Sequence, residues 1–509
     1  METKTAAIEM RNITKRFGPV LANDKVWLNI YRGEILALLG ENGSGKTTLM
    51  NMLSGIYFPD EGEIKIDGQE VVIRSPKDAF DNGIGMIHQH FKLVDVLTAA
   101  ENIVLGLPGK LDLKAASAKI REICDKYGFS VDPSQKIYDM SVSQKQTVEI
   151  VKVLYRGADI LILDEPTAVL TPQETDKLFA VLRNMRNDGK AIVIITHKMH
   201  EVEALSDRVA ILRHGQFIGD MLTAQTNAQE MTNMMVGHAV SLNIERPDPV
   251  DPKPRIEVKG LTVRSVDGIV KLDDVSFTAN SGEILGIAGI SGCGQKELLE
   301  AIAGLQTVES GSISYIEDDG SREELIGKDP LSIAELGVSL SFVPEDRLGM
   351  GLVGNMNLAD NMMLRSFRRG KSIFTDRRSP RALAESVVQE LSVSTPSVDT
   401  PVRRLSGGNV QKVLVGREIA SAPTVLLTAY AVRGLDIHSS YTIYDLINRQ
   451  KKAGVSVIFV GEDLDVLLEL CDRILVLCGG KVSGIVSGRG AEKREVGMMM
   501  TKLGGQSHE

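Results

Sequence analysis

Apolar residues in this chain gather in short runs of strand length that alternate with helical patterns. Runs rich in Ile, Leu and Val predict buried strands at 35–39, 159–163 and 191–195. Similar runs return at 424–427 and 455–460. Strands that alternate with helices in this way predict an α/β fold with a largely parallel sheet.

The chain contains two related halves. The run Arg32-Gly33-Glu34-Ile35-Leu36 recurs as Ser281-Gly282-Glu283-Ile284-Leu285, a shift of 282 − 33 = 249. Further on, Asp207-Arg208 recurs as Asp472-Arg473, a shift of 472 − 207 = 265. Two copies of one fold explain this repetition, and the growing shift predicts short insertions in the second copy near residues 317–320 and 348–354.

A Pro-rich charged segment at 244–254 separates the halves, and its prolines exclude a helix or a central strand. We therefore expect a first domain at 5–240, a linker at 241–254 and a second domain at 255–505.

Charge and composition narrow the class of protein. The 509 residues carry a formal net charge of −9, which disfavours a protein that coats nucleic acid, because phosphate neutralisation needs surplus Lys and Arg. No apolar run approaches the ~18–20 residues of a membrane-spanning helix, and residues 1–10 lack the pattern of a secretory signal. The four cysteines lack Cys-x-x-Cys pairs, so we expect buried thiols in a reducing compartment, the cytosol, and no zinc site.

One glycine-rich run has the pattern of a phosphate-binding loop. Gly40-Glu41-Asn42-Gly43-Ser44-Gly45-Lys46-Thr47-Thr48 follows a predicted strand and precedes a helical pattern. In such a loop, backbone N–H groups converge on phosphate oxygens, the lysine reaches the β- and γ-phosphates, and the hydroxyl of Thr47 is available to Mg²⁺. A chance glycine turn is the alternative, and the strand and helix around the loop argue against it.

Two adjacent carboxylates end the predicted strand at 159–163. An aspartate at the carboxyl end of a parallel strand, here Asp164, is placed to hold Mg²⁺, and the neighbouring Glu165 can polarise an attacking water. Both could instead be solvated acids at a strand end.

The order of these motifs resembles that of ATP-binding-cassette (ABC) ATPases. It comprises Phe17, the loop Gly40–Thr48, Gln89, Ser141–Gln144, Asp164-Glu165 and His197, together with Leu405-Ser406-Gly407-Gly408-Asn409, which resembles the family's signature motif. The resemblance covers nearly the whole chain, twice. It implies two tandem ABC ATPase domains of the P-loop NTPase fold, each with a RecA-like core, an antiparallel β subdomain and an α-helical signature subdomain.

The resemblance also implies roles for individual residues. Phe17 would stack on adenine, Gln89 would sense the γ-phosphate, Glu165 would be the general base, and His197 the γ-phosphate switch. The signature residues Ser406, Gly407 and Gly408 would complete the ATP site. The residues that would hold Mg²⁺ are Thr47, Gln89 and Asp164. Without the family, Phe17 is an apolar residue that closes a strand, and the signature run is a helix-capping turn.

The second half has lost the residues of this chemistry. Gly294-Gln295-Lys296 stands where the first half has Gly45-Lys46-Thr47, so the phosphate lysine and the metal hydroxyl are missing. Ala429-Tyr430-Ala431 stands where the first half has Asp164-Glu165-Pro166. The second loop is therefore not expected to hydrolyse ATP.

In the second half, acidic residues also replace the two residues that are expected to contact the γ-phosphate in the first half. Glu462 matches His197 (462 − 197 = 265), and Glu345 matches Gln89. A carboxylate that faces a triphosphate without a lysine or Mg²⁺ is electrostatically unfavourable. No aromatic residue near Val266 matches Phe17.

The first half has one defect of its own. In Ser141-Val142-Ser143, a serine replaces the second glycine of the signature, and its Cβ would crowd a backbone that approaches phosphate. In this family two cassettes pair head to tail, so the intact first loop would face intact Ser406-Gly407-Gly408, and the two damaged motifs would face each other. We infer an intramolecular pseudo-dimer with one working ATP site.

Such cassettes drive membrane transport, or act on DNA or ribosomes. A tandem chain without a spanning segment resembles importer ATPases that bind separate permease subunits on the cytoplasmic face of the inner membrane, supplied by an extracytoplasmic solute-binding protein. The permeases would dock near Gln89 and Glu345, on segments that include Glu101-Asn102 and Asp360-Asn361. The ribosome-associated type has a long charged linker and two competent sites, and the DNA-repair type has zinc motifs and a basic surface, so we favour transport without nucleic acid.

The cargo is inferred from the subgroup alone. The run Val343-Pro344-Glu345-Asp346-Arg347 resembles the monosaccharide and nucleoside uptake group. His88-Gln89-His90-Phe91 and the loss of acids at Ala429-Tyr430 resemble its nucleoside members. A monosaccharide importer of the ribose, galactose or xylose type remains the alternative.

Overall fold

The computed structural model of the protein describes residues 6–501 except 90, 110, 169, 197, 239–242, 266, 291 and 368–374. His197, the predicted γ-phosphate switch, lies outside the described residues, as do His90 and Val266. The chain divides into two compact units, Met1–Ser241 and Leu242–Glu509. In the described part of the chain, no helix is long and apolar enough to span a bilayer.

The strands of the first unit are β1 (Ala6–Phe17), β2 (Val20–Tyr31), β3 (Glu34–Leu39), β4 (Glu61–Ile66), β5 (Gln69–Val71), β6 (Ile84–Ile87), β7 (Ile160–Asp164), β8 (Ala191–Ile195), β9 (Arg208–Arg213) and β10 (Gln216–Leu222). Its α-helices are α1 (Lys46–Leu53), α2 (Pro76–Asp81), α3 (Ala99–Val104), α4 (Leu113–Tyr127), α5 (Val142–Tyr155), α6 (Pro172–Asn187), α7 (Met199–Leu205) and α8 (Ala228–Val236).

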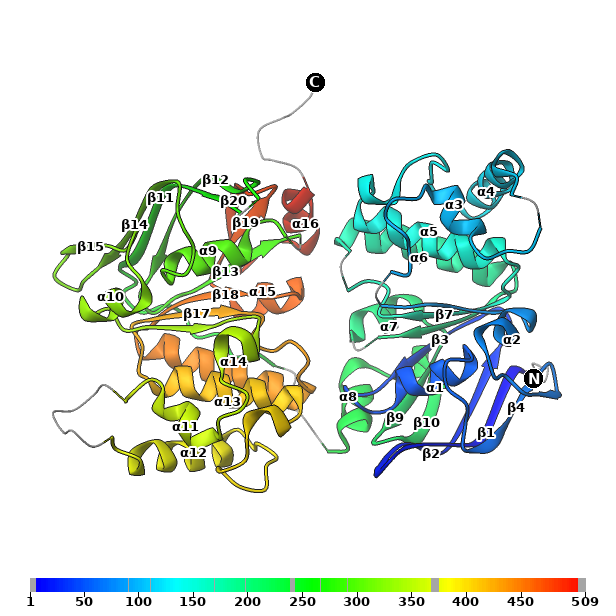
Figure 1. The fold of residues 1–509 in the computed structure, drawn as a ribbon, viewed down its shortest axis with the longest axis horizontal. Coiled ribbons are helices and arrows are strands. Elements are labelled where there is room, and N and C mark those ends of the chain that lie inside the picture. Colours follow the sequence, from blue (N-terminus) through cyan, green and yellow to red (C-terminus); the bar gives the residue numbers. More distant parts are fainter. Residues whose placement is uncertain are drawn as a thin grey trace. The chain divides into compact units, whose positions relative to one another are not determined.

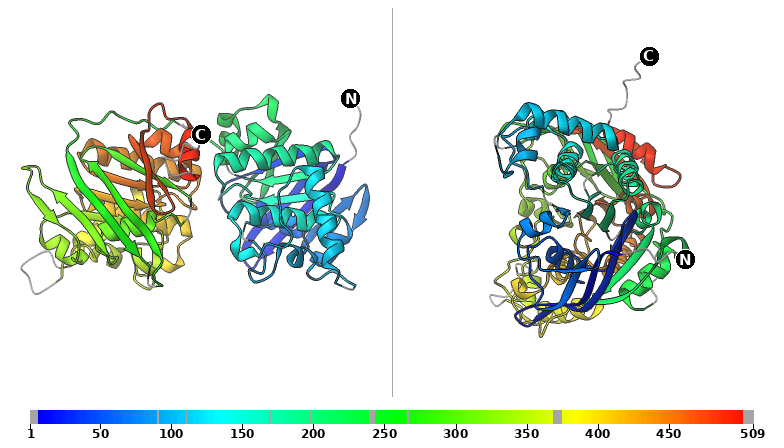
Figure 2. Two further views of the ribbon diagram at one scale, coloured as in Figure 1. Left: turned by 90° about the horizontal axis from the view of Figure 1, so that it is seen from above. Right: turned by 90° about the vertical axis from the view of Figure 1, so that its right-hand side faces the viewer.

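Two sheets form separate layers of the first unit (Figure 1; Figure 2). The antiparallel sheet has the strand order β2-β1-β4-β5, and the six-stranded sheet has the order β10-β9-β3-β8-β7-β6. In the six-stranded sheet, neighbouring strands are parallel except β9 and β10. The predicted α/β fold with a largely parallel sheet is therefore confirmed.

Strand β3 shows why its sequence is a continuous apolar run. Ile35 packs with α5 and α6 on one face of the sheet, while Leu36 and Leu38 pack with α1 and the antiparallel sheet on the other. Because successive side chains of a strand point to opposite faces, a strand covered on both faces needs apolar residues throughout. Helix α1 is thereby held between the two sheets, directly after the glycine loop.

Helices α3 and α4, with one face of α5, form a core of their own. It contains Ala99 and Ile103 of α3, Ile120 and Cys124 of α4, and Val148 of α5. This helical subdomain is separate from the sheet core, as Figure 1 shows at the top of the first unit. The signature residues Ser141–Gln144 lie where it meets the rest of the unit, at the start of α5.

The strands of the second unit are β11 (Pro254–Arg264), β12 (Val270–Asn280), β13 (Ile284–Gly289), β14 (Ser310–Ile316), β15 (Arg322–Glu324), β16 (Leu340–Val343), β17 (Val425–Ala429), β18 (Ser456–Val460), β19 (Arg473–Cys478) and β20 (Lys481–Ser487). Its α-helices are α9 (Gln295–Ile302), α10 (Pro330–Glu335), α11 (Leu358–Met363), α12 (Arg378–Glu390), α13 (Gly407–Ala420), α14 (Ile437–Lys452), α15 (Leu464–Leu470) and α16 (Lys493–Thr501). Its sheets, β12-β11-β14-β15 and β20-β19-β13-β18-β17-β16, repeat the topology of the first unit.

The predicted linker has no helix or strand at 243–253, yet it is bound to the second unit. Ile244 belongs to that unit's hydrophobic core. Nη1 of Arg246 donates to the carbonyl of Leu468 at 2.8 Å, and the buried Lys451 donates to the carbonyl of Pro247 and, at 2.7 Å, to Asp472. The segment therefore belongs to the second unit and is not a free tether.

Candidate functional site

The glycine loop of the first unit has the geometry of a phosphate cradle. Gly45 precedes α1 with φ of +95°, and a Cβ there would lie 2.3 Å from the carbonyl oxygen of Ala22. Among the residues with a described position, no side chain caps this helix, so the N–H groups of its first turn face the loop. A helix N-terminus with free N–H groups favours an anion through hydrogen bonds and through its dipole.

Lys46 lies at the mouth of the loop. Its Nζ donates to the carbonyls of Gly40 at 2.7 Å and Glu41 at 3.0 Å. Burial lowers the pKa of Lys46, against the charges of Glu165 and Asp164, which raise it. In the described part of the chain, the hydrogen bonds of this buried ammonium go to uncharged carbonyl oxygens, so an added anion would supply a negatively charged partner.

Ser44 provides an independent indication of a ligand. The residue is 4% exposed, and its Oγ has no hydrogen-bond partner among the residues that the structure describes. Buried hydroxyls are nearly always paired, so an orphaned one inside a glycine loop fits a phosphate oxygen that would accept its proton. The loop residues present therefore fit a nucleoside triphosphate.

Asp164 and Thr47 form a pair of oxygen ligands beside Lys46. Oγ1 of Thr47 donates to Oδ2 of Asp164 at 3.2 Å. Burial and the adjacent charge of Glu165 raise the pKa of Asp164, although the Thr47 hydrogen bond and Lys46 lower it. Hard oxygen donors next to a phosphate site are what Mg²⁺ prefers, so the donor set fits that ion. Mg²⁺ bound here would neutralise phosphate charge.

Glu165 occupies a strained position at the end of β7. Its φ is +46°, a region that non-glycine residues rarely adopt and that often marks active sites. Nε2 of Gln89 donates to Oε2 of Glu165 at 2.8 Å. The structure thus brings together Gln89, Glu165, Asp164, Thr47 and the loop, as the motif order predicts.

Phe17 lies at the end of β1 with 41% of its surface exposed. Its ring packs edge-on against Tyr57, 5.1 Å between centroids, and Lys15 lies 5.6 Å from its centroid. An exposed aromatic ring held from one side can stack on a base. Adenine stacking itself stays a prediction.

Both signature serines cap a helix. Ser141 forms a capping box with Gln144 at the start of α5. Ser406 accepts from the backbone N–H of Asn409 at 3.4 Å and from its Nδ2 at 2.9 Å, and α13 begins at Gly407. The capping interpretation of the 405–409 run is therefore confirmed, and the Ser141 motif has the same kind of cap. In both motifs the first N–H groups of the helix are oriented toward the loop.

The second unit keeps the shape of the first site without its chemistry. Gly294 precedes α9 with φ of +98°, but the matched side chain is Gln295, whose Nε2 donates to the carbonyl of Ile290 at 3.0 Å. Tyr430 takes the place of Glu165 with the same left-handed backbone, φ +54°. Burial, with the charges of Glu345 and Glu462, raises the pKa of Tyr430 to about 12, so this position holds no base at neutral pH.

Sequence reasoning missed Arg433. Its guanidinium pairs with Glu345 and, at 2.9 Å, with Glu462, and lies 5.9 Å from the ring centroid of Tyr430. At the shift of 265, Arg433 matches Ala168 of the first unit. The replacement of alanine by arginine, close to the positions where the second unit has lost the acidic pair, is the sequence feature that could have revealed it. Arg433 neutralises the two carboxylates that the sequence leaves unpaired.

The predicted docking segments need a correction at their asparagines. Asn102 is 2% exposed and Asn361 is 0% exposed. Asn102 accepts from the N–H of Val94 at 2.8 Å, and Asn361 does the same for Val353. Both side chains hold a loop from inside and are not available to a docking partner.

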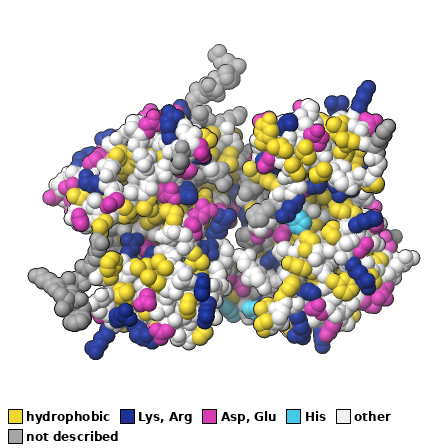
Figure 3. Space-filling view, viewed as in Figure 1, with side chains coloured by type: hydrophobic (Ala, Val, Ile, Leu, Met, Phe, Trp, Pro, Cys, Tyr) yellow, Lys and Arg dark blue, Asp and Glu magenta, His cyan; other side chains and the backbone are white. Residues whose placement is uncertain are grey.

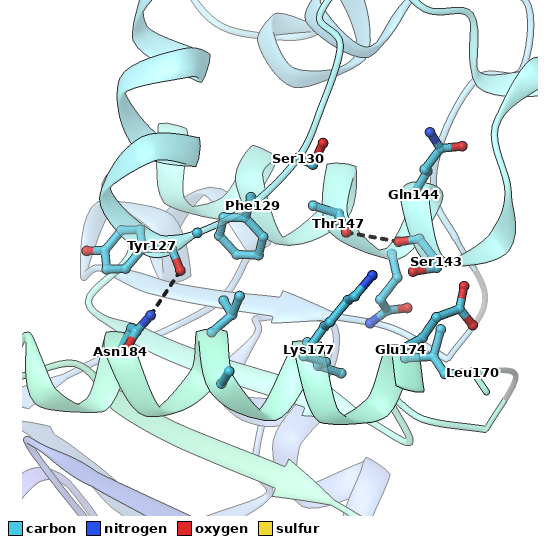
Figure 4. A pocket seen from close by; sticks show the side chains of 15 residues that line it. Tyr127, Phe129, Ser130, Ser143, Gln144, Thr147, Leu170, Glu174, Lys177 and Asn184 are labelled. Carbon is cyan, nitrogen blue, oxygen red and sulfur yellow. Dashed lines mark hydrogen bonds between the residues drawn. The ribbon is translucent and has the colours of Figure 1, made fainter. Parts of the chain in front are cut away.

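A cavity of about 480 Å³ lies in the first unit between α5, α6 and the residues after α4. Figure 4 shows Lys177 and Glu174 of α6 pointing into it, opposite Ser143 and Thr147 of α5. The cavity contains none of the predicted P-loop or carboxylate residues. Ser143, the residue that departs from the signature, therefore lies against a gap between the helical subdomain and α6.

The expectation that all four cysteines are buried needs a partial correction. Among the described residues, no cluster of three or more His, Cys, Asp or Glu side chains could hold a metal ion. Cys124 and Cys471 are buried as expected, but Cys293 and Cys478 are only partly buried.

Comparison with known proteins extends these observations. A family model described as ABC transporter matches residues 23–168 and 272–428. The chain is 42% identical to the nucleoside import ATP-binding protein NupA of Lactococcus lactis subsp. cremoris (strain MG1363), covering 99% of each. It is 40% identical to the guanosine import ATP-binding protein NupO of Bacillus subtilis (strain 168), covering 97% of each. It is 39% identical to the glucose import ATP-binding protein TsgD13 of Haloferax volcanii, covering 98% of this chain and 96% of that protein.

Among solved structures, one similar chain comes from the complex of archaeal ribosomal stalk protein aP1 and archaeal ribosome recycling factor aABCE1. The TM-score is 0.61 at 16% identity, covering 91% of this chain and 87% of that chain. At that identity the likeness shows the fold alone.

The fold and the first-unit site define a P-loop ATPase built from two cassettes. The chain belongs to the ABC transporter family, whose ATP-binding proteins are ATPases.

Proposed function

We propose that this chain is the ATP-hydrolysing subunit of an importer for nucleosides. The observation that carries the proposal is full-length similarity to two import ATP-binding proteins named for a nucleoside cargo, at 42% and 40% identity. The residues His88-Gln89-His90-Phe91 and the loss of acids at Ala429-Tyr430 support the same subgroup. A monosaccharide cargo is the second candidate, supported by the relative named for glucose import at 39% identity.

Hydrolysis takes place at the first unit's loop in this proposal. The loop N–H groups and Lys46 bind the triphosphate, Thr47 and Asp164 hold Mg²⁺, and Glu165 accepts a proton from the attacking water. Gln89 orients Glu165 through the 2.8 Å hydrogen bond. Phe17 stacks on adenine, and His197 contacts the γ-phosphate.

The signature of the second unit completes the site in this proposal. The losses in the chain support it: the loop with its lysine and acids is in the first unit, and the signature with both glycines, Ser406-Gly407-Gly408, is in the second. In head-to-tail pairing, these intact parts serve one nucleotide. Lesions that accumulated at random would affect both composite sites.

The chain works with membrane partners in this proposal. It binds permease subunits at the cytoplasmic face of the inner membrane through the segments near Gln89 and Glu345, and an extracytoplasmic binding protein delivers the cargo. Exposed apolar side chains follow both segments, including Val96 and Leu111 in the first unit and Met350 and Val353 in the second. On the face drawn in Figure 3, acidic and basic side chains occur together over each unit, which supports a partner other than nucleic acid.

Uptake in cells tests the proposal. Labelled nucleosides and a labelled pentose are supplied to cells that carry Glu165→Gln in place of the wild-type chain. We expect nucleoside uptake to collapse while pentose uptake is retained. Loss of pentose uptake instead would overturn the nucleoside assignment in favour of the sugar one. Retention of both, with ATPase activity gone, would overturn the importer role.

A further inference from the structure

The second unit carries an insertion directly after the predicted sensor position. Glu345 matches Gln89 at a shift of 345 − 89 = 256, whereas Val353 matches Val94 at a shift of 353 − 94 = 259. The second match is secured by structure, because Asn102 and Asn361 accept from these two valines in the same way. Three extra residues therefore lie between Glu345 and Val353.

The insertion forms a π-helical turn, η3 (Arg347–Gly351). The side chain of Asp346 accepts from the N–H of Gly349 at 2.8 Å and closes its start. Single π-turns are rare and frequently occur at functional positions. In the first unit, the described residues of the matched segment contain no helical turn before α3.

Both ends of this turn are bonded to the helix that carries the signature. At the start of α13, Nη1 of Arg347 donates to the carbonyl of Gly407 at 2.8 Å. Near the end of α13, Nη2 of Arg417 donates to the carbonyl of Gly351 at 2.7 Å. Arg417 is 6% exposed, so this second bond is buried. These two hydrogen bonds thus fix the position of the turn along α13.

The guanidinium of Arg347 lies in a narrow space between two loops. A Cβ on Gly407 would lie 3.2 Å from Nη1, and one on Gly434 would lie 3.5 Å from Nη2. Nη2 also donates to the carbonyl of Arg433. The planar guanidinium therefore bridges the signature loop to the loop after β17, which a single ammonium group cannot do with the same geometry.

The loop after β17 is itself held by the altered site. Arg433 pairs with Glu345 and Glu462, the residues that replace Gln89 and His197. Each pair is half-exposed and individually weak, but together they attach the loop after β17 to the ends of β16 and β18, the two strands that flank β17 in the sheet. The side chains that replaced the nucleotide chemistry thus support the carbonyl that Arg347 contacts.

Within the described part of the first unit, no such arrangement surrounds the altered signature. Phe91 matches Arg347 at the shift of 256, and Ala168 matches Arg433 at the shift of 265. Neither side chain has a hydrogen-bonding group. The arginine bridge therefore accompanies only the signature that retains both glycines.

We propose that Arg347 is a positioning residue for ATP hydrolysis. It fixes the Ser406-Gly407-Gly408 loop in the conformation that binds the nucleotide held by the first unit, and it links this loop to the segment after Glu345. The inference rests on the proposed function, because it needs the second signature to act on the first unit's nucleotide.

The test compares Arg347→Ala and Arg347→Lys with Arg381→Ala in the full-length chain. Arg381 is a matched control, since it is an exposed arginine of the same unit with two 2.8 Å bonds to Asp399. We expect Arg347→Ala to lower kcat about tenfold per folded molecule, because a displaced positioning group commonly costs one to two orders of magnitude. ATP binding to the glycine loop of the first unit is expected to be unchanged. It is measured as the rise in the melting temperature of the first unit when ATP is added.

The lysine variant and the control separate positioning from folding. Arg347→Lys keeps the charge and is expected to recover less than half of the lost kcat, and Arg381→Ala to stay within twofold of wild type. A wild-type kcat in Arg347→Ala or full recovery in Arg347→Lys would overturn the inference. Failure of the proposed function is distinct, since Glu165→Gln would then hydrolyse ATP as fast as the wild-type chain.

Discussion

Gln89 donates a 2.8 Å hydrogen bond to Glu165, and Glu165 adopts a left-handed backbone with φ of +46°. The bond joins the end of β6, which leads into the predicted docking segment, to the end of β7, which carries the predicted base. Movement of that segment would therefore alter the orientation of Glu165. At the matched positions of the second unit, Glu345 lacks the amide of Gln89, and Tyr430 lacks the carboxylate of Glu165.

Glu165→Gln is expected to lower ATP hydrolysis by 10²–10⁴-fold, the usual contribution of a general base. ATP binding should persist, because the loop and Lys46 are unchanged. Phosphate release and nucleotide retention by the full-length chain measure the two effects. The matched control is Tyr430→Phe at the same backbone position of the second unit, which should leave the rate within twofold. A Glu165→Gln rate near that of the wild type would contradict the assignment of the base.

A reciprocal exchange tests whether one loop or two hydrolyse ATP. Lys46→Gln is expected to abolish turnover and to remove the stabilisation by ATP, which is about 2.7 kcal/mol at a hundredfold excess over Kd. Gln295→Lys is expected to leave the rate within twofold, because Tyr430 still supplies no base. Trp27, the one tryptophan of the chain, lies in the first unit, so its fluorescence reports the melting of that unit. A doubled rate in Gln295→Lys would show that the second loop is competent.

Asp164→Asn is expected to stabilise the first unit at neutral pH. Burial and Glu165 raise the pKa of Asp164 in the folded protein, so the folded state binds this proton more tightly than the unfolded state. The ionised Asp164 therefore lowers the free energy of unfolding. This loss of stability is complete above the pKa of Asp164 in the folded state and absent below its pKa in the unfolded state. The melting temperature followed by Trp27 fluorescence should rise by a few degrees at pH 8, and the gain should shrink toward about pH 4. A gain that grows on acidification would contradict this sign.

Lys451→Met is expected to destabilise the second unit by about 3–5 kcal/mol, the cost of leaving a buried charge unpaired. Lys451 is 2% exposed, and its ammonium binds Asp472 at 2.7 Å as well as the carbonyl of Pro247. Hydrogen exchange of β13 and β19 measures the loss. The neighbouring exposed Lys452→Met is the control and should change stability by less than about 0.5 kcal/mol. If the two variants changed the stability of the second unit equally, Lys451 would not be needed to attach the 244–248 segment to that unit.

Most of the fold and half of the site could be predicted from the sequence. Continuous apolar runs such as that of β3 have few alternatives to a strand buried on both faces. The glycines of the loop are required by the backbone, because positive φ and a close carbonyl at Gly45 exclude a side chain. Motifs of this kind depend on local geometry, and local geometry is encoded in adjacent residues.

The tertiary structure decided what depends on residues far apart in the chain. The burial of Asn102 and Asn361 corrects their expected place on a docking surface. The orphaned Ser44 hydroxyl, the attachment of the 244–248 segment to the second unit, and the bridge from Arg347 to Gly407 across sixty positions have no local sequence signature. Each depends on which atoms meet after the sheet has formed, since hydrogen-bond satisfaction and desolvation are properties of the packed molecule. The sequence by itself determined the elements, the repeat and the loss of the second catalytic acids, and only the packed structure decided which side chains hold the remaining parts in place.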